Sequence, residues 1–205
     1  MINIFCDAET TGLNCYCDEI IEMYFHINND INYHYKARPL EWSYEAEQIH
    51  GITYGEANLY PDKSIAIKNL INWFSNIGSF RLITYANKNT ELGIINFDVA
   101  CLWNEINLLG YPQYFLENKL GMKEPLSVHD TAKYCAKNGY FTPIRGKSGR
   151  QSFSQENVYL SLFDEKYNAH NCVDDTKALV KIYNKLLKLN NESNSDLFWH
   201  QTSYS

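Results

Sequence analysis

The stretch that decides the fold reads Ile2-Asn3-Ile4-Phe5-Cys6-Asp7-Ala8-Glu9-Thr10-Thr11-Gly12-Leu13. Residues 2–7 alternate in the way that predicts a β-strand. Asp7 and Glu9 stand two residues apart at its end, so both carboxylates point to the same side. Like charges this close repel each other unless a cation lies between them. Hard divalent cations such as Mg²⁺ or Mn²⁺ prefer oxygen ligands. This stretch alone leaves two alternatives open, a metal site at a strand end and a solvated pair of acids, and the rest of the chain has to decide between them.

The composition is that of an ordinary globular protein. The chain has 205 residues, of which 45% are hydrophobic and 20% charged, and this length suits a single domain. The formal net charge of −6 argues against a protein that coats nucleic acid through a broad basic surface. It does not exclude an enzyme that grips a few nucleotides through metal ions.

The sequence also gives an expectation for the cellular compartment in which the protein works. It contains no apolar run of about 18 residues and no basic segment before the first strand, so we expect neither a transmembrane helix nor a secretory signal. Without a signal, reduced thiols are expected, in the cytoplasm of a cell or of an infected host. Spacing also argues against a zinc site, because no Cys-x-x-Cys pair occurs among Cys6, Cys15, Cys17, Cys101, Cys135 and Cys172.

Periodicity predicts strands first, followed by alternating helices and strands, which indicates a mixed α/β sheet with helices packed on it. Strands are expected over residues 2–7, 20–28, 31–37 and 80–85. Ser43 is expected to cap a short helix that turns Ala46 and Ile49 inward and ends at Gly51. Further helices are expected over residues 65–77, 97–109, 127–138, 154–162 and 169–187. Residues 87–91 and 139–153 are expected to be loops, and residues 190–205 a polar tail.

Three further residues have the chemistry of a metal-dependent active site. Asp98 opens a helix, and Asp175 lies in the last long helix, five residues after His170. Since helix neighbours are three or four residues apart, we expect His170 at or before the helix start, with Asp175 one turn in. Each residue has a simpler alternative. Asp98 would serve as a helix cap, His170 as a loop histidine, and Asp175 as part of a solvated acidic helix start.

Taken in order, these motifs resemble the DEDDh exonucleases, the DnaQ-like branch of the ribonuclease H-like superfamily. The matching segments are Asp-x-Glu-Thr-Thr-Gly-Leu at 7–13, Asn-Phe-Asp at 96–98 and His-Asn-x-x-x-Asp at 170–175, supported by residues 18–22, 50–53 and 175–179. The resemblance covers residues 2–188. It implies a ribonuclease H-like mixed five-stranded sheet, with three antiparallel opening strands and then parallel strands, flanked by helices. The exonuclease domain would span residues 1–189, followed by the tail.

The chain departs from the family at the second motif. Family members commonly carry His-Asn four residues before Phe-Asp, where this chain has Gly93-Ile94. The nearest substitute is Ala86-Asn87, which requires an insertion over residues 88–94. Asp98 remains the candidate for the third acid, and Glu91 and Glu105 are its alternatives.

The resemblance implies two divalent cations, Mg²⁺ or Mn²⁺. Asp7, Glu9 and Asp175 would hold the first, Asp7 would bridge to the second, and Asp98 would act on the second, directly or through water. His170 would be the general base, since an unperturbed histidine with a pKa of about 6.5 suits proton transfer near neutral pH.

The resemblance also implies how a 3′ end would be held. Thr10, Thr11 and Gly12 would bind the terminal nucleotide through backbone N–H groups and hydroxyls, and Leu13 would press on the last base. His50 would line the same pocket, and Asn87 is a candidate nucleotide contact. From the residues alone, core packing is the alternative for Leu13, and a helix-end histidine is the alternative for His50. The remaining candidates lie in a basic stretch with interleaved aromatic residues, which suits single strands but also suits a solvated loop: Arg145, Lys147 and Arg150.

The function expected from this resemblance is a 3′→5′ exonuclease that releases nucleoside monophosphates from single-stranded or frayed DNA. A 3′→5′ exoribonuclease of the RNase T type stays open, as does a non-catalytic nucleic-acid-binding module of the same fold. Partners expected besides single-stranded DNA or RNA 3′ ends are a DNA polymerase or a second copy of the chain. The apolar Leu197-Phe198-Trp199 in the tail would dock on a polymerase or on the chain itself.

Overall fold

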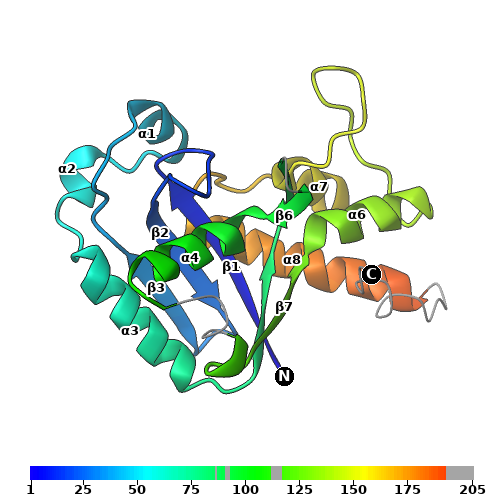
Figure 1. Ribbon diagram of the computed structural model, residues 1–205. Coiled ribbons are helices and arrows are strands. Elements are labelled where there is room, and N and C mark those ends of the chain that lie inside the picture. Colours follow the sequence, from blue (N-terminus) through cyan, green and yellow to red (C-terminus); the bar gives the residue numbers. More distant parts are fainter. Residues whose placement is uncertain (86, 91–92, 112–116, 193–205) are drawn as a thin grey trace.

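The computed structural model describes residues 1–85, 87–90, 93–111 and 117–192, with only the backbone of residues 87–90 and 93–95. The elements follow one another along the chain as strands first and then mixed helices and strands (Figure 1). They are β1 (Ile2–Thr10), β2 (Ile20–His26), β3 (Asn32–Lys36), α1 (Tyr44–His50), α2 (Tyr54–Ala57), α3 (Lys63–Ser75), β4 (Phe80–Thr84), β5 (Asn87–Thr90), β6 (Gly93–Asn96), α4 (Phe97–Leu108), β7 (Met122–Ser127), α6 (Val128–Lys137), α7 (Gln155–Phe163) and α8 (Cys172–Glu192).

The main sheet has five strands in the order β3-β2-β1-β4-β7. β1, β2 and β3 pair antiparallel as a meander. β1 pairs parallel with β4, and β4 pairs parallel with β7. The expected ribonuclease H-like arrangement, three antiparallel strands followed by parallel ones, is confirmed. β1 lies at the centre of the sheet, so the carboxyl end of β1 is surrounded by other elements.

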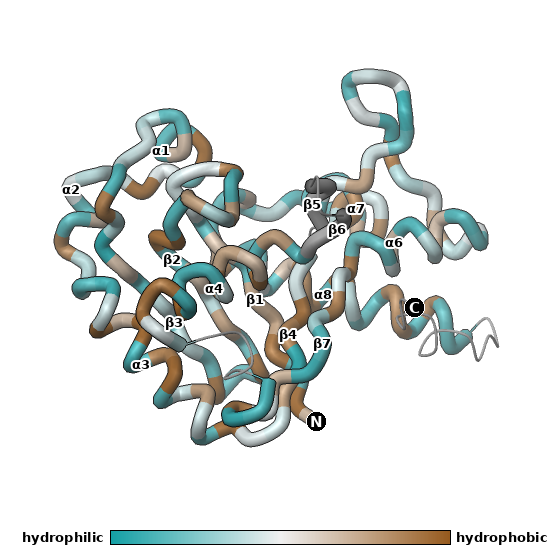
Figure 2. Tube along the Cα trace, in the orientation of Figure 1, coloured by the Kyte–Doolittle hydropathy of each residue, from teal (hydrophilic) through white to brown (hydrophobic). Residues whose placement is uncertain are grey.

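Helices cover both faces of this sheet (Figure 1). α3 and α4 contribute to one apolar core, and α6, α7 and α8 contribute to another. Strand alternation divides β1 between them: Ile4 and Cys6 belong to the first core, whereas Phe5 packs edge-on against Tyr183 of α8. Asp7 and Glu9 follow Phe5 by two and four residues along the strand, so their side chains point to the same face of the sheet, the face covered by α8. Figure 2 shows hydrophobic and hydrophilic residues alternating along the helices, as expected of helices with one apolar face.

The sequence predicted most of these elements, including the cap of α1. The Ser43 side chain accepts from the Ala46 N–H at 3.2 Å, and Gly51 ends the helix with a φ of 74° that a residue with a Cβ adopts only at a cost. The prediction that Ile49 points inward is wrong, because its side chain is 59% exposed while Ala46 is buried.

Two strand predictions are corrected. Residues 87–90, expected as a loop, form β5, which pairs with β6 in a separate two-stranded sheet. Met122–Ser127 forms the edge strand β7, although Pro125 and two charged residues gave it no strand pattern. Proline is tolerated there because an edge strand leaves one row of N–H groups unpaired.

The last helix also differs from its expected bounds. α8 begins at Cys172 rather than residue 169, and it runs to Glu192, past the boundary expected at residue 190. Asn190 is buried within it. The Leu197-Phe198-Trp199 segment lies outside the described residues. In the part of the chain that the structure describes, no helix combines the length and the apolar character needed to span a bilayer.

Candidate active site

The carboxyl end of β1 meets the first turn of α8 at a cluster of carboxylates. Asp7 and Glu9 project from β1 on the α8 face, and Asp175 projects back from α8. Ligand oxygens of these three residues all lie within 4.8 Å of one another. The structure therefore brings together three of the four acids that the sequence singled out, from positions about 170 residues apart.

Asp98 joins the cluster from the opposite helical layer. It lies in the first turn of α4 and is buried. The helix cap is Asn96, whose side chain accepts from the Val99 N–H at 3.3 Å and donates to the Thr84 hydroxyl at 2.5 Å. Asp98 is thus not needed as the cap, which removes the simpler explanation for this acid.

Burial raises the pKa of all four carboxyl groups, and neighbouring carboxylates raise those of Asp7, Glu9 and Asp98 further. Burial, followed by the charges of Asp98, Asp175 and Glu9, raises the pKa of Asp7 well above its usual range. The same causes, burial first and then Asp175, raise the pKa of Glu9 to about 8 and that of Asp98 to about 7. Burial also raises the pKa of Asp175. The cluster holds more negative charge than the protein around it neutralises.

This donor set fits a hard divalent cation. Such ions take carboxylate oxygens as ligands, and their charge would relieve the repulsion that raises the pKa values. The residues that would hold such a cation are Asp7, Glu9 and Asp175.

Three residues hold Asp175 in place, and the sequence did not single out two of them, Tyr167 and Gln155. The Tyr167 hydroxyl donates to Asp175 Oδ1 at 2.6 Å, and the backbone N–H of Asn171 donates to Oδ2 at 3.0 Å. Gln155 of α7 donates to the Asp175 carbonyl oxygen at 2.6 Å. Tyr167 and Gln155 escaped prediction because they lie in no motif and reach the site from a loop and a separate helix.

His170 lies just before α8, as the motif spacing predicted. It is exposed and has a φ of 64°, a left-handed conformation that is uncommon outside glycine. Its proximity to Asp175 lowers the pKa of that carboxyl, against the larger effect of burial. Strained residues of this kind are often found at functional sites. His170 is therefore an exposed residue beside Asp175, just before the start of α8.

Hydrogen bonds within the protein hold the loop that follows β1. The Thr10 hydroxyl donates to the Gly12 carbonyl at 2.6 Å, and Thr11 donates its N–H to the Glu19 carbonyl at 2.9 Å. This N–H is therefore used within the protein, and the nucleotide contacts expected of the segment stay a prediction. A Cβ on Gly12 would lie 2.7 Å from Cγ of Asp18, so a side chain there would have to displace that carboxylate.

Leu13 is open to a ligand, whereas His50 is half-buried. Leu13 is 73% exposed, so core packing does not explain it. His50 ends α1, and its Nδ1 accepts from the Ile52 N–H at 3.0 Å. Its Nε2 is buried and has no hydrogen-bond partner among the described residues. The side chain of Asn87 lies outside the described residues, and its backbone pairs with Asn96 where β5 runs antiparallel to β6. The insertion expected after Ala86-Asn87 stays a prediction.

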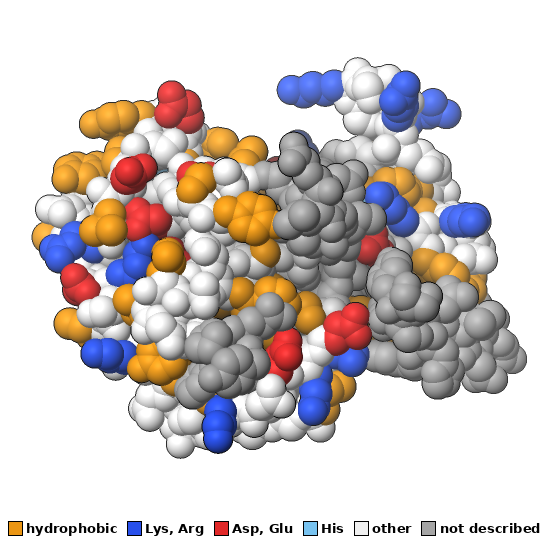
Figure 3. Space-filling model, in the orientation of Figure 1, with side chains coloured by type: hydrophobic (Ala, Val, Ile, Leu, Met, Phe, Trp, Pro, Cys, Tyr) orange, Lys and Arg blue, Asp and Glu red, His pale blue; other side chains and the backbone are white. Residues whose placement is uncertain are grey.

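The basic residues Arg145, Lys147 and Arg150 are exposed on a loop between α6 and α7, residues 145–151, called the basic excursion below. An isolated bridge from Arg145 to Gln151 closes it, and the Arg145 guanidinium donates to the Gly149 carbonyl at 2.9 Å. The excursion stands away from the body of the molecule, and Figure 3 shows Lys and Arg side chains at its tip. The structure therefore does not place these residues at the carboxylates.

Comparisons with known proteins define the fold. No family model matches the chain, and no curated protein matches it. The strand order and directions are those of the ribonuclease H-like fold, and solved structures of this class match closely in shape.

The similar structures are exonuclease I enzymes. E. coli exonuclease I in complex with a dT13 oligonucleotide matches 93% of this chain with a TM-score of 0.75 and 18% identity. A moderately thermophilic exonuclease I from Methylocaldum szegediense matches 92% with a TM-score of 0.76 and 17% identity. This chain spans about two fifths of those proteins, 42% in each case. At such identity the likeness shows the fold alone.

Proposed function

We propose that the chain is a metal-dependent 3′→5′ exonuclease that hydrolyses single-stranded or frayed DNA and releases nucleoside 5′-monophosphates. The observation that carries the proposal is the convergence of Asp7, Glu9, Asp98 and Asp175 beside an exposed histidine. A purely structural role does not explain four acids gathered in one place, each with a raised pKa. The catalytic domain would extend over residues 1–189.

The chemistry follows from the charge of the substrate. Phosphodiester hydrolysis adds negative charge to a phosphorus already surrounded by oxygens, and two bound Mg²⁺ or Mn²⁺ ions supply the compensating positive charge. Asp7, Glu9 and Asp175 would hold one ion, and Asp7 and Asp98 the other. His170 takes a proton from the attacking water as general base. Tyr167 and Asn171 keep the Asp175 carboxylate in its orientation throughout.

The comparisons support DNA as the substrate over RNA. The similar exonuclease I structures include complexes with single-stranded DNA. In this chain, the exposed Leu13 would press on the last base, and His50 would line the same pocket. The excursion with Arg145, Lys147 and Arg150 would contact the strand farther from its 3′ end. No observation favours a polymerase partner or a homodimer.

The test is the degradation of 5′-labelled single-stranded DNA and RNA with Mg²⁺, comparing the wild type with Asp7→Ala and His170→Ala. We expect faster degradation of DNA, no activity in Asp7→Ala, and a loss of about 100-fold or more in His170→Ala. Faster turnover of RNA would instead indicate an exoribonuclease. Degradation of neither polymer would indicate a non-catalytic binding module. Full activity of Asp98→Ala would show that Asp98 is not the third acid.

A further inference from the structure

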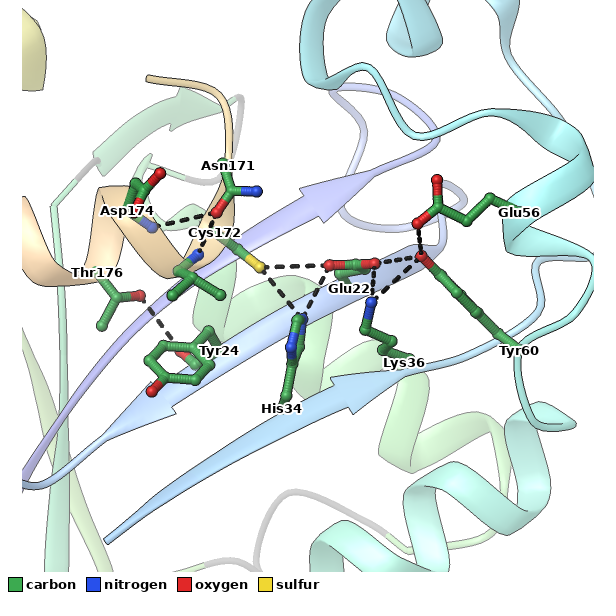
Figure 4. A network of polar contacts seen from close by, with 11 residues as sticks. Glu22, Tyr24, His34, Lys36, Glu56, Tyr60, Asn171, Cys172, Asp174 and Thr176 are labelled. Atoms are coloured by element: carbon green, nitrogen blue, oxygen red, sulfur yellow. Dashed lines mark hydrogen bonds and ion pairs between the residues drawn. The ribbon is translucent and has the colours of Figure 1, made fainter. Parts of the chain in front are cut away.

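A second cluster of possible metal ligands lies outside the carboxylate site. It consists of Glu22 on β2, His34 on β3 and Cys172 at the start of α8 (Figure 4). Glu22 Oε2 is 2.8 Å from His34 Nε2, and Cys172 Sγ is 3.7 Å from both of these atoms. One ligand atom from each residue therefore faces a common point.

The sheet register explains why these residues meet. Glu22 pairs across the strands with Lys36, and Tyr24 pairs with His34, so these side chains share one face of the sheet. α8 covers the same face and places Cys172 over it. His34 follows Glu22 by 12 residues, and Cys172 follows His34 by 138. This spacing matches no zinc motif, which is why the sequence argued against a zinc site.

The distances resemble those between ligands of a tetrahedral zinc ion. Zinc binds sulfur at about 2.3 Å and imidazole nitrogen at about 2.0 Å, which places the two ligand atoms roughly 3.5 Å apart. The separation of 3.7 Å from Cys172 Sγ to His34 Nε2 is close to that value. The hydrogen bond between Glu22 and His34 would have to lengthen by about half an ångström to admit the ion.

We propose that Glu22, His34 and Cys172 form a binding site for a borderline-soft divalent cation of the zinc type, with water as the fourth ligand. Thiolate, imidazole and carboxylate are the ligands such an ion prefers. One thiolate and one carboxylate neutralise its two charges. Cys172 is buried, and binding would release its thiol proton to solvent, which reaches the site past His34, whose side chain is 31% exposed.

Neighbouring side chains already orient the carboxylate for this role. Glu22 Oε1 accepts from Lys36 Nζ at 2.7 Å and from the Tyr60 hydroxyl, and Tyr60 also contacts Glu56 (Figure 4). Oε2 is thereby left to face His34 and Cys172. Such outer contacts are what tune the affinity of a metal site.

The position of the site suggests what an ion would do there. Cys172 lies three residues before Asp175 and two after His170, so an ion would fasten the start of α8 to β2 and β3. Glu22 is also the cross-strand partner of Glu9. The ion would thus stabilise the segment that carries part of the candidate active site, whether or not that site hydrolyses nucleic acid.

The test uses the full chain with Asp7→Asn, which disables the carboxylate site, and titrates it with Co²⁺ as a spectroscopic probe. We expect one equivalent to bind with a thiolate-to-cobalt charge-transfer band, and Zn²⁺ to displace it. Adding Cys172→Ser should abolish the band. The matched control Cys17→Ser removes an exposed thiol and should leave the band unchanged.

Tyr60→Phe keeps all three ligands and so tests the site without changing them. We expect it to lower the affinity for Zn²⁺ by about 10- to 100-fold. A band that survives Cys172→Ser, or the absence of any thiolate band in the folded Asp7→Asn protein, would overturn the proposal. Because the readout is absorption in a protein without nuclease activity, it is independent of the proposed exonuclease reaction.

Discussion

Tyr167 is the residue on which the orientation of Asp175 depends most directly. Its hydroxyl donates to Asp175 Oδ1 at 2.6 Å, and burial together with that carboxylate raises the pKa of Tyr167, so the proton stays on the hydroxyl. Removing an outer contact of a metal ligand typically costs 10- to 100-fold in metal affinity or activity. We expect Tyr167→Phe to lower the activity by about that factor, mainly by raising the Mg²⁺ concentration needed for half-maximal rate.

Tyr159→Phe is the matched control for that measurement. Tyr159 packs against the Tyr167 ring, with centroids 5.0 Å apart, but its hydroxyl accepts from Lys181 instead of contacting Asp175. The substitution Tyr159→Phe should leave the Mg²⁺ concentration needed for half-maximal rate unchanged. An equal effect of both substitutions would assign Tyr167 a packing role only.

The carboxylates predict how the stability of the metal-free protein depends on pH. In the folded protein, burial and neighbouring charges raise the pKa of Glu9 to about 8 and that of Asp98 to about 7. In the unfolded chain both ionise near pH 4, so the folded state binds more protons between those values. The free energy of unfolding should therefore fall as pH rises from about 4 to about 8.

Thermal unfolding in EDTA and in Mg²⁺ measures this effect. In EDTA we expect a higher Tm at about pH 6 than at about pH 8.5, and a larger gain from Mg²⁺ at the higher pH. Burial raises the pKa of Glu22, but hydrogen bonds from His34, Lys36 and Tyr60 outweigh it and lower that pKa to about 2. Glu22 therefore adds stability as pH rises, but only at pH values below this window. The account of the cluster fails if Asp98→Asn leaves the pH dependence in EDTA unaltered.

At the scale of elements, the start of α8 depends on Asn171. Its side-chain oxygen accepts from the N–H groups of Val173 and Asp174 at 3.1 and 3.2 Å, which makes it the helix cap. We expect Asn171→Ala to lower the free energy of unfolding by about 1 kcal/mol in denaturant titration. Asn168→Ala, beside the same segment but outside the cap, should change it less, and equal losses would contradict the capping role.

The basic excursion predicts a salt effect on binding. Each phosphate contact to a single strand contributes about −0.7 to the slope of log K against log salt concentration. We expect the combined change of Arg145, Lys147 and Arg150 to glutamine to weaken oligonucleotide binding and to reduce that slope by up to about 2. Fluorescence anisotropy over a range of salt concentrations measures both. Unchanged slope and affinity would assign the excursion no role in binding.

The sequence predicted elements where one local pattern sufficed. β1 to β4 and the long helices have clear periodicity, whereas β7 is recognisable only from its pairing with β4. The polar residues of β5 gave no strand signal, because hairpin pairing rather than apolar alternation defines that strand. Bounds were less accurate, since the start of α8 depends on the Asn171 cap rather than on its apolar residues.

The candidate site shows the same division. Asp7, Glu9, His170 and Asp175 were singled out because motif spacing relates them, and Asp98 because it opens a helix and follows Asn96-Phe97. Tyr167 and the Glu22–His34–Cys172 cluster depend on tertiary contacts between segments far apart in the chain. No spacing rule in one sequence contains that information.

At the scale of the whole molecule, the site exists only where both helical layers meet the end of β1. Asp98 comes from α4 on one face of the sheet, and Asp175 from α8 on the other. Their separate cores hold them in place, so the four acids are brought together by the complete fold. This arrangement makes the cluster a property of the assembled domain.

The central claim is that this cluster hydrolyses nucleic acid from the 3′ end. The most direct measurement follows one single-stranded DNA oligonucleotide labelled either at its 3′-terminal nucleotide or at its 5′ end, in Mg²⁺, with wild type and Asp7→Asn. We predict that the wild type releases the 3′ label at once as a mononucleotide and shortens the 5′-labelled strand stepwise, while Asp7→Asn does neither. Release of the 5′ label first, or equal cleavage by both proteins, would contradict the account.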